Sequence, residues 1–273
     1  MERTDEPPGT FYYSVPREVR PMKMQCRTIL AAGALLLTSA SAVYAQSSGD
    51  GYLFHAPEGR LTLRAGYDHA NANSDVFTQS IDLLTLKKAD FSGMTIGAEA
   101  AYSIGSRFDL SADFSFTHKT KGSEYRALID NNNLPIQQST TFDRLPLSVN
   151  ARFYLIEPGR SIGKLAWIPN KVVPWVGAGA GVMWYRFRQQ GDFVDYQNNN
   201  VFNTGLNDPL DAKAWTGMYQ AMGGADFSLS PHVAVRVDSR YVWAKAPLGS
   251  GFSGYNPIDL SGVQGTLGLT YRL

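Results

Sequence analysis

An alternation of apolar and polar residues recurs in eight segments of this 273-residue chain, and it constrains the fold more than any other feature. In the first segment Leu61, Leu63 and Ala65 would share one face of an extended chain, with polar residues on the other face. A period of two is the signature of a β-strand that has one apolar face. The other seven segments are centred near Ala98, Ala112, Val149, Ala180, Ala221, Val237 and Leu267. No helical pattern longer than a turn or two lies between them, so the sequence predicts an all-β chain of eight strands.

The charged residues on the polar faces indicate where those faces point. An apolar strand face can pack into a soluble sandwich or face lipid, as in a membrane barrel. The bases on the polar faces are arginines, which pair with carboxylates through two parallel hydrogen bonds and suit a confined interior. We therefore expect an ion-pair network inside a barrel, formed by Arg64, Asp68, Glu99, Asp109, Asp113, Arg152, Asp226, Arg236, Asp238 and Arg240. With Arg272 counted, five bases meet six acids, and this near balance favours mutual neutralisation over a charge-selective pore.

The aromatic residues of the apolar faces sort by strand end. If the first strand runs upward, the upper set is Tyr67, Phe114, Phe116, Trp184, Trp215, Tyr219, Tyr241 and Trp243. The lower set is Tyr102, Phe108, Phe153, Phe227 and Tyr271. Two aromatic girdles around an apolar band are typical of a transmembrane barrel, whereas a sandwich core gives no reason for such sorting. The sequence predicts an eight-stranded antiparallel up-and-down transmembrane β-barrel.

The connections between the segments differ in length at the two ends. Gly105–Arg107 and Ser230–His232 are tight turns at the lower end. Long polar loops are expected at the upper end, near residues 70–90, 119–141, 188–214 and 247–257. The lower connection 156–172 is an exception, because it is long and contains Trp167. We expect a short interfacial segment there, with Trp167 at the membrane surface, and a periplasmic partner site is the alternative.

The N-terminal region reads as an export signal. Lys23 and Arg27 precede the apolar run Ile29–Leu37, and small residues follow up to Ala45. This order is that of a secretory signal peptide, here residues 22–45, with cleavage between Ala45 and Gln46. Residues 1–21 are interpreted as a non-native upstream extension, with translation starting at Met22 or Met24 rather than Met1. The barrel domain would then be 46–273.

Composition excludes several other classes of protein. The net charge is +1, which argues against nucleic-acid binding, since phosphate contacts need a basic surface. The single Cys, Cys26, excludes a disulfide framework and a Cys-based zinc site, and it would leave with the signal peptide. No apolar run approaches the ~18 residues of a membrane-spanning helix. Neither a metal nor a cofactor is expected.

Two strands carry a resemblance to a known family. The segment Val173–Gly181 and the closing segment Gly265–Leu273, together with the signal peptide, resemble the small outer-membrane β-barrels that include OmpA-, OmpX- and OmpW-like proteins. The resemblance implies residence in the cell outer membrane, contact with its lipid and lipopolysaccharide, and recognition by the outer-membrane assembly machinery. It also implies that the assembly signal is formed by Leu267, Leu269, Tyr271 and Leu273, with Leu273 in place of the usual terminal Phe.

The sequence says less about activity than about architecture. The expected function is a structural, surface-binding or minor solute-passing role, with Asn131–Asn133 and Asn198–Asn200 as solvated loop tips that could contact external sugars. The first alternative is a passive channel for small or apolar molecules. The second is an enzyme that modifies outer-leaflet lipids, centred on His118 with Thr120 two residues on. Because a histidine at a strand end is more often a polar rim residue, no catalytic residue is assigned and no enzyme is expected.

Overall fold

The computed structural model describes residues 52–130, 133–163, 166–195, 200–204 and 210–273. The expected upstream extension, signal peptide and cleavage site lie outside these ranges. Asn131, Asn132, Asn198 and Asn199 of the two predicted loop tips also lie outside them.

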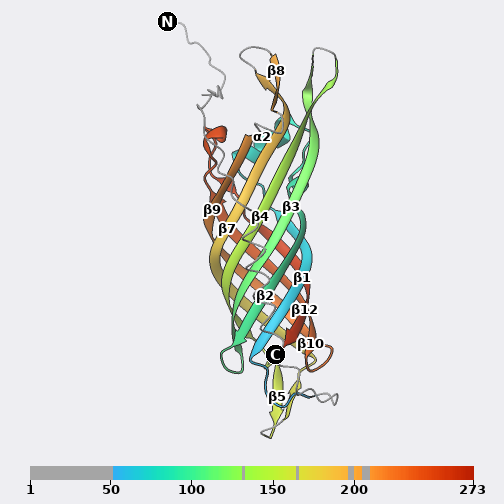
Figure 1. Ribbon diagram of the computed structural model, residues 1–273, viewed down its shortest axis with the longest axis vertical. Helices are drawn as coiled ribbons and strands as arrows, with labels where there is room; N and C mark the ends of the chain where they lie inside the picture. The colour runs from blue at the N-terminus through green and yellow to red at the C-terminus, as the bar shows by residue number, and fades with distance from the viewer. Residues whose placement is uncertain (1–51, 131–132, 164–165, 196–199, 205–209) are drawn as a thin grey trace, which may run out of the picture. The chain divides into compact units, whose positions relative to one another are not determined.

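Eight antiparallel strands close into one barrel (Figure 1). They are β1 (Gly59–Ala70), β2 (Gly93–Ser103), β3 (Phe108–Ile129), β4 (Pro135–Tyr154), β7 (Val172–Asp195), β9 (Leu210–Ser228), β10 (Val233–Ala246) and β12 (Gly262–Arg272). Each strand pairs with the next one in this series. β12 pairs back with β1, from Arg272 opposite Arg60 to Gly262 opposite Ala70, and this closes the sheet. The predicted eight-stranded up-and-down barrel is confirmed.

Shorter elements occupy the connections. They are α2 (Asp75–Leu83), η2 (Lys88–Phe91), β5 (Gly159–Ile162), β6 (Ala166–Pro169), β8 (Asn200–Thr204), η3 (Ser250–Phe252) and β11 (Ile258–Asp259). β8 extends a hairpin with β7, and β5 pairs with β6 in a separate hairpin at the other end of the barrel (Figure 1). Among the described residues, no helix is both long enough and apolar enough to cross a membrane.

Side chains alternate between the inside and the outside of the barrel along most of each strand. In β12 every second residue is buried, and the residues between are exposed. The exposed set is apolar at mid-strand, where Leu63, Ile96 and Leu267 are 62–70% exposed. The buried set is polar, with Thr62 and Thr270 in hydrogen-bond contact at 2.9 Å. A strand whose exposed face is apolar and whose buried face is polar is built for lipid outside and a polar lumen inside.

The upper connections contain more regular structure than the sequence suggested. Most of 119–141 and 188–214 was expected to be loop, but β3 runs to Ile129, β4 begins at Pro135, and β7 runs to Asp195. The 24 residues of β7 span roughly 80 Å at ~3.3 Å per residue, several times an apolar band of about 25 Å. These strands therefore continue beyond the apolar band as paired hairpins. The region 70–90 also forms the nine-residue helix α2, which the sequence pattern did not indicate.

The lower connection 156–172 differs from the expectation of an interfacial segment. Trp167 lies in β6 and is only 4% exposed, so its ring is covered by protein instead of facing a membrane surface. Its backbone exchanges hydrogen bonds with Leu53 at 2.7 and 2.9 Å. The Arg272 guanidinium lies 5.7 Å from the centre of a Trp167 ring, a cation–π contact. Trp167 is buried because the hairpin, the residues before β1 and the end of β12 pack around it.

Candidate functional site

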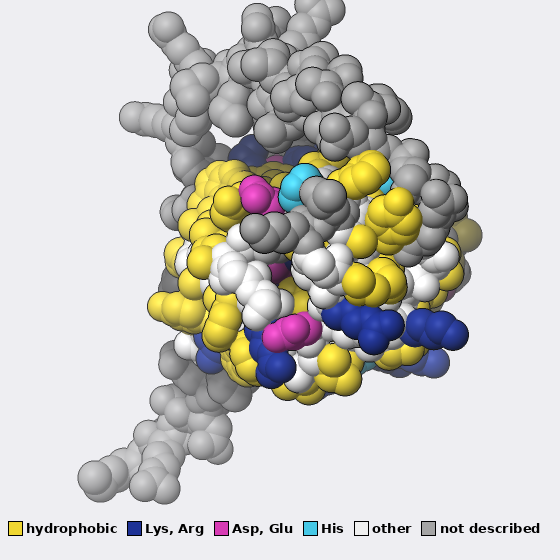
Figure 2. All heavy atoms as spheres, turned by 90° about the horizontal axis from the view of Figure 1, so that it is seen from below, with side chains coloured by type: hydrophobic (Ala, Val, Ile, Leu, Met, Phe, Trp, Pro, Cys, Tyr) yellow, Lys and Arg dark blue, Asp and Glu magenta, His cyan; other side chains and the backbone are white. Residues whose placement is uncertain are grey.

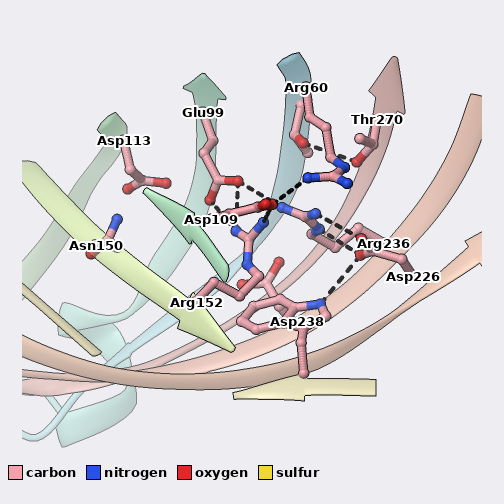
Figure 3. Close-up of polar contacts among 12 residues, drawn as sticks. Arg60, Glu99, Asp109, Asp113, Asn150, Arg152, Asp226, Arg236, Asp238 and Thr270 are labelled. Carbon is pink, nitrogen blue, oxygen red and sulfur yellow. Dashed lines mark hydrogen bonds and ion pairs between the residues drawn. The ribbon is translucent and has the colours of Figure 1, made fainter. Parts of the chain in front are cut away.

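The middle of the barrel interior holds a chain of ion pairs built around Glu99 (Figure 3). Arg152 donates to both carboxylate oxygens of Glu99, at 2.6 and 2.7 Å. Arg236 donates to Glu99 at 2.7 Å and makes two parallel hydrogen bonds to Asp226 at 2.7 and 2.8 Å. Trp175 donates to Asp226 at 3.2 Å, and its ring lies 4.3 Å from the Arg152 guanidinium carbon. These side chains come from five strands, so the cluster links opposite walls of the barrel.

A second group lies beside the first. Arg60 donates to Asp109 at 2.6 Å, and the Tyr154 hydroxyl donates to the same carboxylate oxygen at 2.6 Å. Arg152 lies 3.8 Å from that oxygen and connects the two groups. The sequence prediction included Asp109 but omitted Arg60 and Tyr154. Arg60 shares the parity of Thr62 and Arg64 on the first strand, so extending the alternation downward by one more inward position would have found it.

A third group occupies the interior nearer the upper end. Asp113 pairs with Arg64 and accepts a hydrogen bond from Arg240 at 3.1 Å. Arg240 also donates to Asp238 at 2.9 Å, and Asp238 accepts from the Thr266 hydroxyl at 2.6 Å. Above this group Asp68 pairs with Arg144 at 2.9 Å, and Arg144 was another omission of the sequence analysis.

Arg272 behaves differently from the other predicted lumen bases. It is buried, but it has no recorded ion pair with a carboxylate in the described part of the chain. Its guanidinium instead donates to the Ser228 hydroxyl at 2.6 Å and to the carbonyls of Ser230 and Pro231 at 3.2 Å. Counting Arg272 as an ion-pairing base was therefore wrong. At the strand end, turn carbonyls that the sheet leaves unpaired are available as acceptors.

A cluster of aromatic rings fills the interior above the ion pairs. The Phe77 ring, from α2, lies 4.6 Å from Phe91, 5.5 Å from Phe142 and 5.6 Å from Phe187. Phe252, from η3, lies 5.6 Å from Phe187. Phe77, Phe142 and Phe187 are at most 2% exposed. The sequence predicts polar loops at this level, and that prediction is wrong where this second core forms.

The predicted girdle residues all project from the outer surface. Some of them contact one another: the ring centres of Phe108 and Phe153 are 4.9 Å apart, and those of Tyr241 and Trp243 are 4.6 Å apart. Figure 2, a view from below, shows hydrophobic side chains over much of the margin of the molecule. The predicted assembly signal is also exposed. Leu267, Leu269 and Tyr271 occupy outward-facing positions of β12, and Leu273 is the residue after the end of this strand.

His118 lies on the outer surface just above the upper aromatic residues of β3. Its Nδ1 lies 2.6 Å from the Asp143 carboxylate, and its Nε2 lies 3.4 Å from the Thr120 hydroxyl. Thr120 in turn lies 2.9 Å from the hydroxyl of Thr141. The sequence suggested His118 and Thr120 together, but it missed Asp143, which comes from the neighbouring strand β4.

The described residues offer little for a metal ion or a large ligand. None of their His, Cys, Asp and Glu side chains form a group of three or more that could hold a metal. A hollow of about 270 Å³ lies beside the β3–β4 hairpin, lined by Thr85, Gly122, Ser123, Glu124, Gln137 and Gln138. Its lining is mainly polar, unlike the mostly apolar pockets that bind drug-sized ligands.

Comparisons with known proteins give likeness in fold alone. No family model and no curated protein matches the chain. Neisserial surface protein A is 10% identical, covering 83% of this chain and 100% of its own, with a TM-score of 0.42. The outer membrane protein OprG from Pseudomonas aeruginosa is 14% identical, covering 81% and 99%, with a TM-score of 0.43. The outer membrane protease OmpT from Escherichia coli is 8% identical, covering 84% and 99%, with a TM-score of 0.32. The strand pairing of the chain itself shows the closed eight-stranded barrel that the sequence predicted.

Proposed function

We propose that the protein is an integral outer-membrane β-barrel whose interior does not conduct, and whose role is structural and surface-binding. The apolar exterior between two aromatic girdles supports residence in the membrane. The upper hairpins, which run well beyond this band, supply the surface that an external ligand would meet. The exposed side chains of Ile129 and Leu134 lie at the end of the β3–β4 hairpin.

The observation that carries the proposal is a double obstruction of the lumen. Arginines and carboxylates that are buried and paired with one another fill its middle, around Glu99 and Asp113. The aromatic cluster around Phe77 fills its upper end. An ion or polar solute would have to displace both, and the near balance of charge leaves no field to select an ion.

The proposed partners follow from the exterior. The girdle residues would contact outer-membrane lipid at the level of the headgroups, and the upper girdle would meet lipopolysaccharide. The outward-facing residues of β12, ending in Leu273, would be the segment that the assembly machinery reads.

Single-channel recording in planar bilayers tests the closed interior. The wild-type barrel should give no stable conductance steps, whereas a variant that loses Glu99, Arg152 and Arg236 together should give steps once Phe77 is also replaced by Ala. Heat-modifiable gel mobility serves as the control that each sample is a folded barrel. Stable steps from the wild type would support the alternative of a passive channel and contradict the proposal.

A further inference from the structure

The outer surface changes character in one register row of four strands. Trp184 of β7 lies opposite Leu145 and Trp215, and these three residues are apolar. Two residues further up, Arg186 lies opposite Asp143 and Lys213, and Asp143 lies opposite His118. The row formed by His118, Asp143, Arg186 and Lys213 is therefore the first charged row above the aromatic belt. Aromatic belts lie at the interface of a bilayer, where the ester carbonyls of its lipids are found.

Three side chains in and next to this row are arranged as a nucleophile, a base and an orienting acid. The Asp143 carboxylate accepts from Nδ1 of His118 at 2.6 Å, which places the lone pair of a neutral imidazole on Nε2. Nε2 faces the Thr120 hydroxyl at 3.4 Å, a distance typical of looser unliganded sites. Positions 118 and 120 share a strand face because they are two residues apart, and position 143 is opposite 118 in the register.

The surroundings of the three residues distinguish them from an ordinary surface ion pair. The Asp143 side chain is only 11% exposed, whereas that of His118 is 56% exposed. The Phe116 ring stacks on the imidazole at 6.5 Å with an interplanar angle of 18°. The imidazole is thus oriented from two sides while its reactive edge stays open to the membrane interface.

An arginine with a free buried N–H group lies in the adjacent row. Arg188 is opposite Thr141, the hydroxyl neighbour of Thr120. Its Nε is buried and has no hydrogen-bond partner in the described part of the chain. Arg186, in contrast, is neutralised by two hydrogen bonds to Asp211 at 2.7 and 2.9 Å. Asp211 lies opposite Arg188 in the register, but its carboxylate is bonded to Arg186. The free Nε–H of Arg188, beside the hydroxyl pair, is suited to hold a lipid phosphate.

We infer that Thr120, His118 and Asp143 form a catalytic triad that hydrolyses acyl esters of outer-leaflet lipids. The Thr120 Oγ1 attacks the ester carbonyl carbon while Nε2 of His118 takes its proton, and Asp143 stabilises the imidazolium. The imidazolium then gives that proton to the departing alcohol oxygen, which leaves an acyl ester on Thr120. Water attacks this ester with His118 again as the base, and the products are a fatty acid and the free enzyme. This activity lies on the outer wall and is independent of whether the lumen conducts.

The test measures fatty-acid release by the full-length protein in two kinds of vesicle. One contains phosphatidylethanolamine and the other contains lipopolysaccharide, so the two sources of acyl ester are separated. The wild type should release fatty acid in at least one arm. Thr120→Val, His118→Gln and Asp143→Asn should each lower the rate by about 10²- to 10⁴-fold, the usual contribution of a general base or its partners. Thr120→Ser keeps the hydroxyl and should keep the activity.

A second histidine provides a matched control. His69 also lies at the outward upper end of a strand, and its Nδ1 lies 3.2 Å from a hydroxyl, that of Ser92. Its recorded partner is a hydroxyl rather than a carboxylate, so His69→Gln should leave the rate unchanged. A phosphonate that reacts with activated hydroxyls should label Thr120 in the wild type but fail to label the protein in the His118→Gln variant. Heat-modifiable mobility verifies that each variant is folded. No release in either arm, or release that persists in Thr120→Val, would overturn the inference.

Discussion

The middle and the upper end of the barrel are formed by the same strands, but the polar and apolar side chains exchange faces between the two regions. In the middle, β7 places Gly179 inside and Val182 outside, and the interior is charged. Further up, the same strand places Phe187 inside and Arg186 outside, and the interior is apolar. The switch occurs at the level of Trp184. The exposed side chains are mainly apolar below this level and mainly polar above it, the pattern expected when lipid surrounds the lower part and water the upper part.

One chain can therefore place polar side chains inside where lipid surrounds it and apolar side chains inside where water surrounds it. In lipid there is no hydrophobic gain from placing apolar groups inside, so polar side chains gather in the lumen, where they can pair. In water the apolar groups move inside, as in a soluble protein, and α2 supplies Phe77 to complete that core. At the boundary both faces are apolar, as in the run Val182–Tyr185.

The largest expected effect comes from breaking the charged interior at its centre. Glu99→Ala leaves Arg152 and Arg236 as buried neighbours without the carboxylate that they share. We expect a loss of about 3–5 kcal/mol in the free energy of unfolding, measured by urea titration in lipid vesicles. Glu157→Ala is the control, because its pair with Arg107 is about half exposed on both sides and should contribute under ~1 kcal/mol. Equal losses from the two variants would contradict a tightly paired interior.

The next effect tests the change of solvent outside the barrel. Leu63→Arg puts a charge on the outward face at mid-strand and should destabilise the barrel by about 2–4 kcal/mol. Ser139→Arg makes a matched change on the outward face of β4, above the charged row, and should be neutral to within about 0.5 kcal/mol. Unfolding of both variants in the same vesicles provides the measurement. A large cost at Ser139 would place that position within lipid and move the boundary upward.

The smallest effect concerns the apolar core above the membrane level. Ile258→Val removes one buried methylene group from this cluster and should cost about 0.5–1.5 kcal/mol. The loss should appear as faster amide hydrogen exchange in α2 and η3, while exchange in β1 and β12 stays unchanged. Uniformly faster exchange throughout the barrel would mean that the two regions unfold as one unit.

Prediction from sequence succeeded below the level of Trp184 and was less complete above it. The eight strands, their inward and outward faces and most of the lumen charges could be predicted, because alternation is uninterrupted between the girdles. Arg144 and Asp143 were missed because they lie just above Leu145, where the alternation inverts and a segment seems to begin. Phe77 was missed because a nine-residue helix with few buried positions leaves a weak pattern.

Trp167 illustrates a different difficulty. Its sequence neighbours are compatible with a membrane interface, and nothing local indicates that Leu53, β5 and Arg272 will surround it. The pairing of His118 with Asp143 is of the same kind. It depends on the register between β3 and β4, which a single sequence leaves open.

The sequence by itself determined that the chain forms strands with one apolar and one polar face, and that the polar face points inward. Local chemistry suffices for this, because each residue's preference for lipid or for a polar lumen is its own. The tertiary structure alone decided which arginine meets which carboxylate, how aromatic rings from α2 and η3 close the upper end, and which side chains surround His118. The Arg236–Glu99 contact joins residues 137 positions apart, and the His118–Asp143 contact joins residues 25 positions apart. Both exist only once the strands have closed into a barrel with one register.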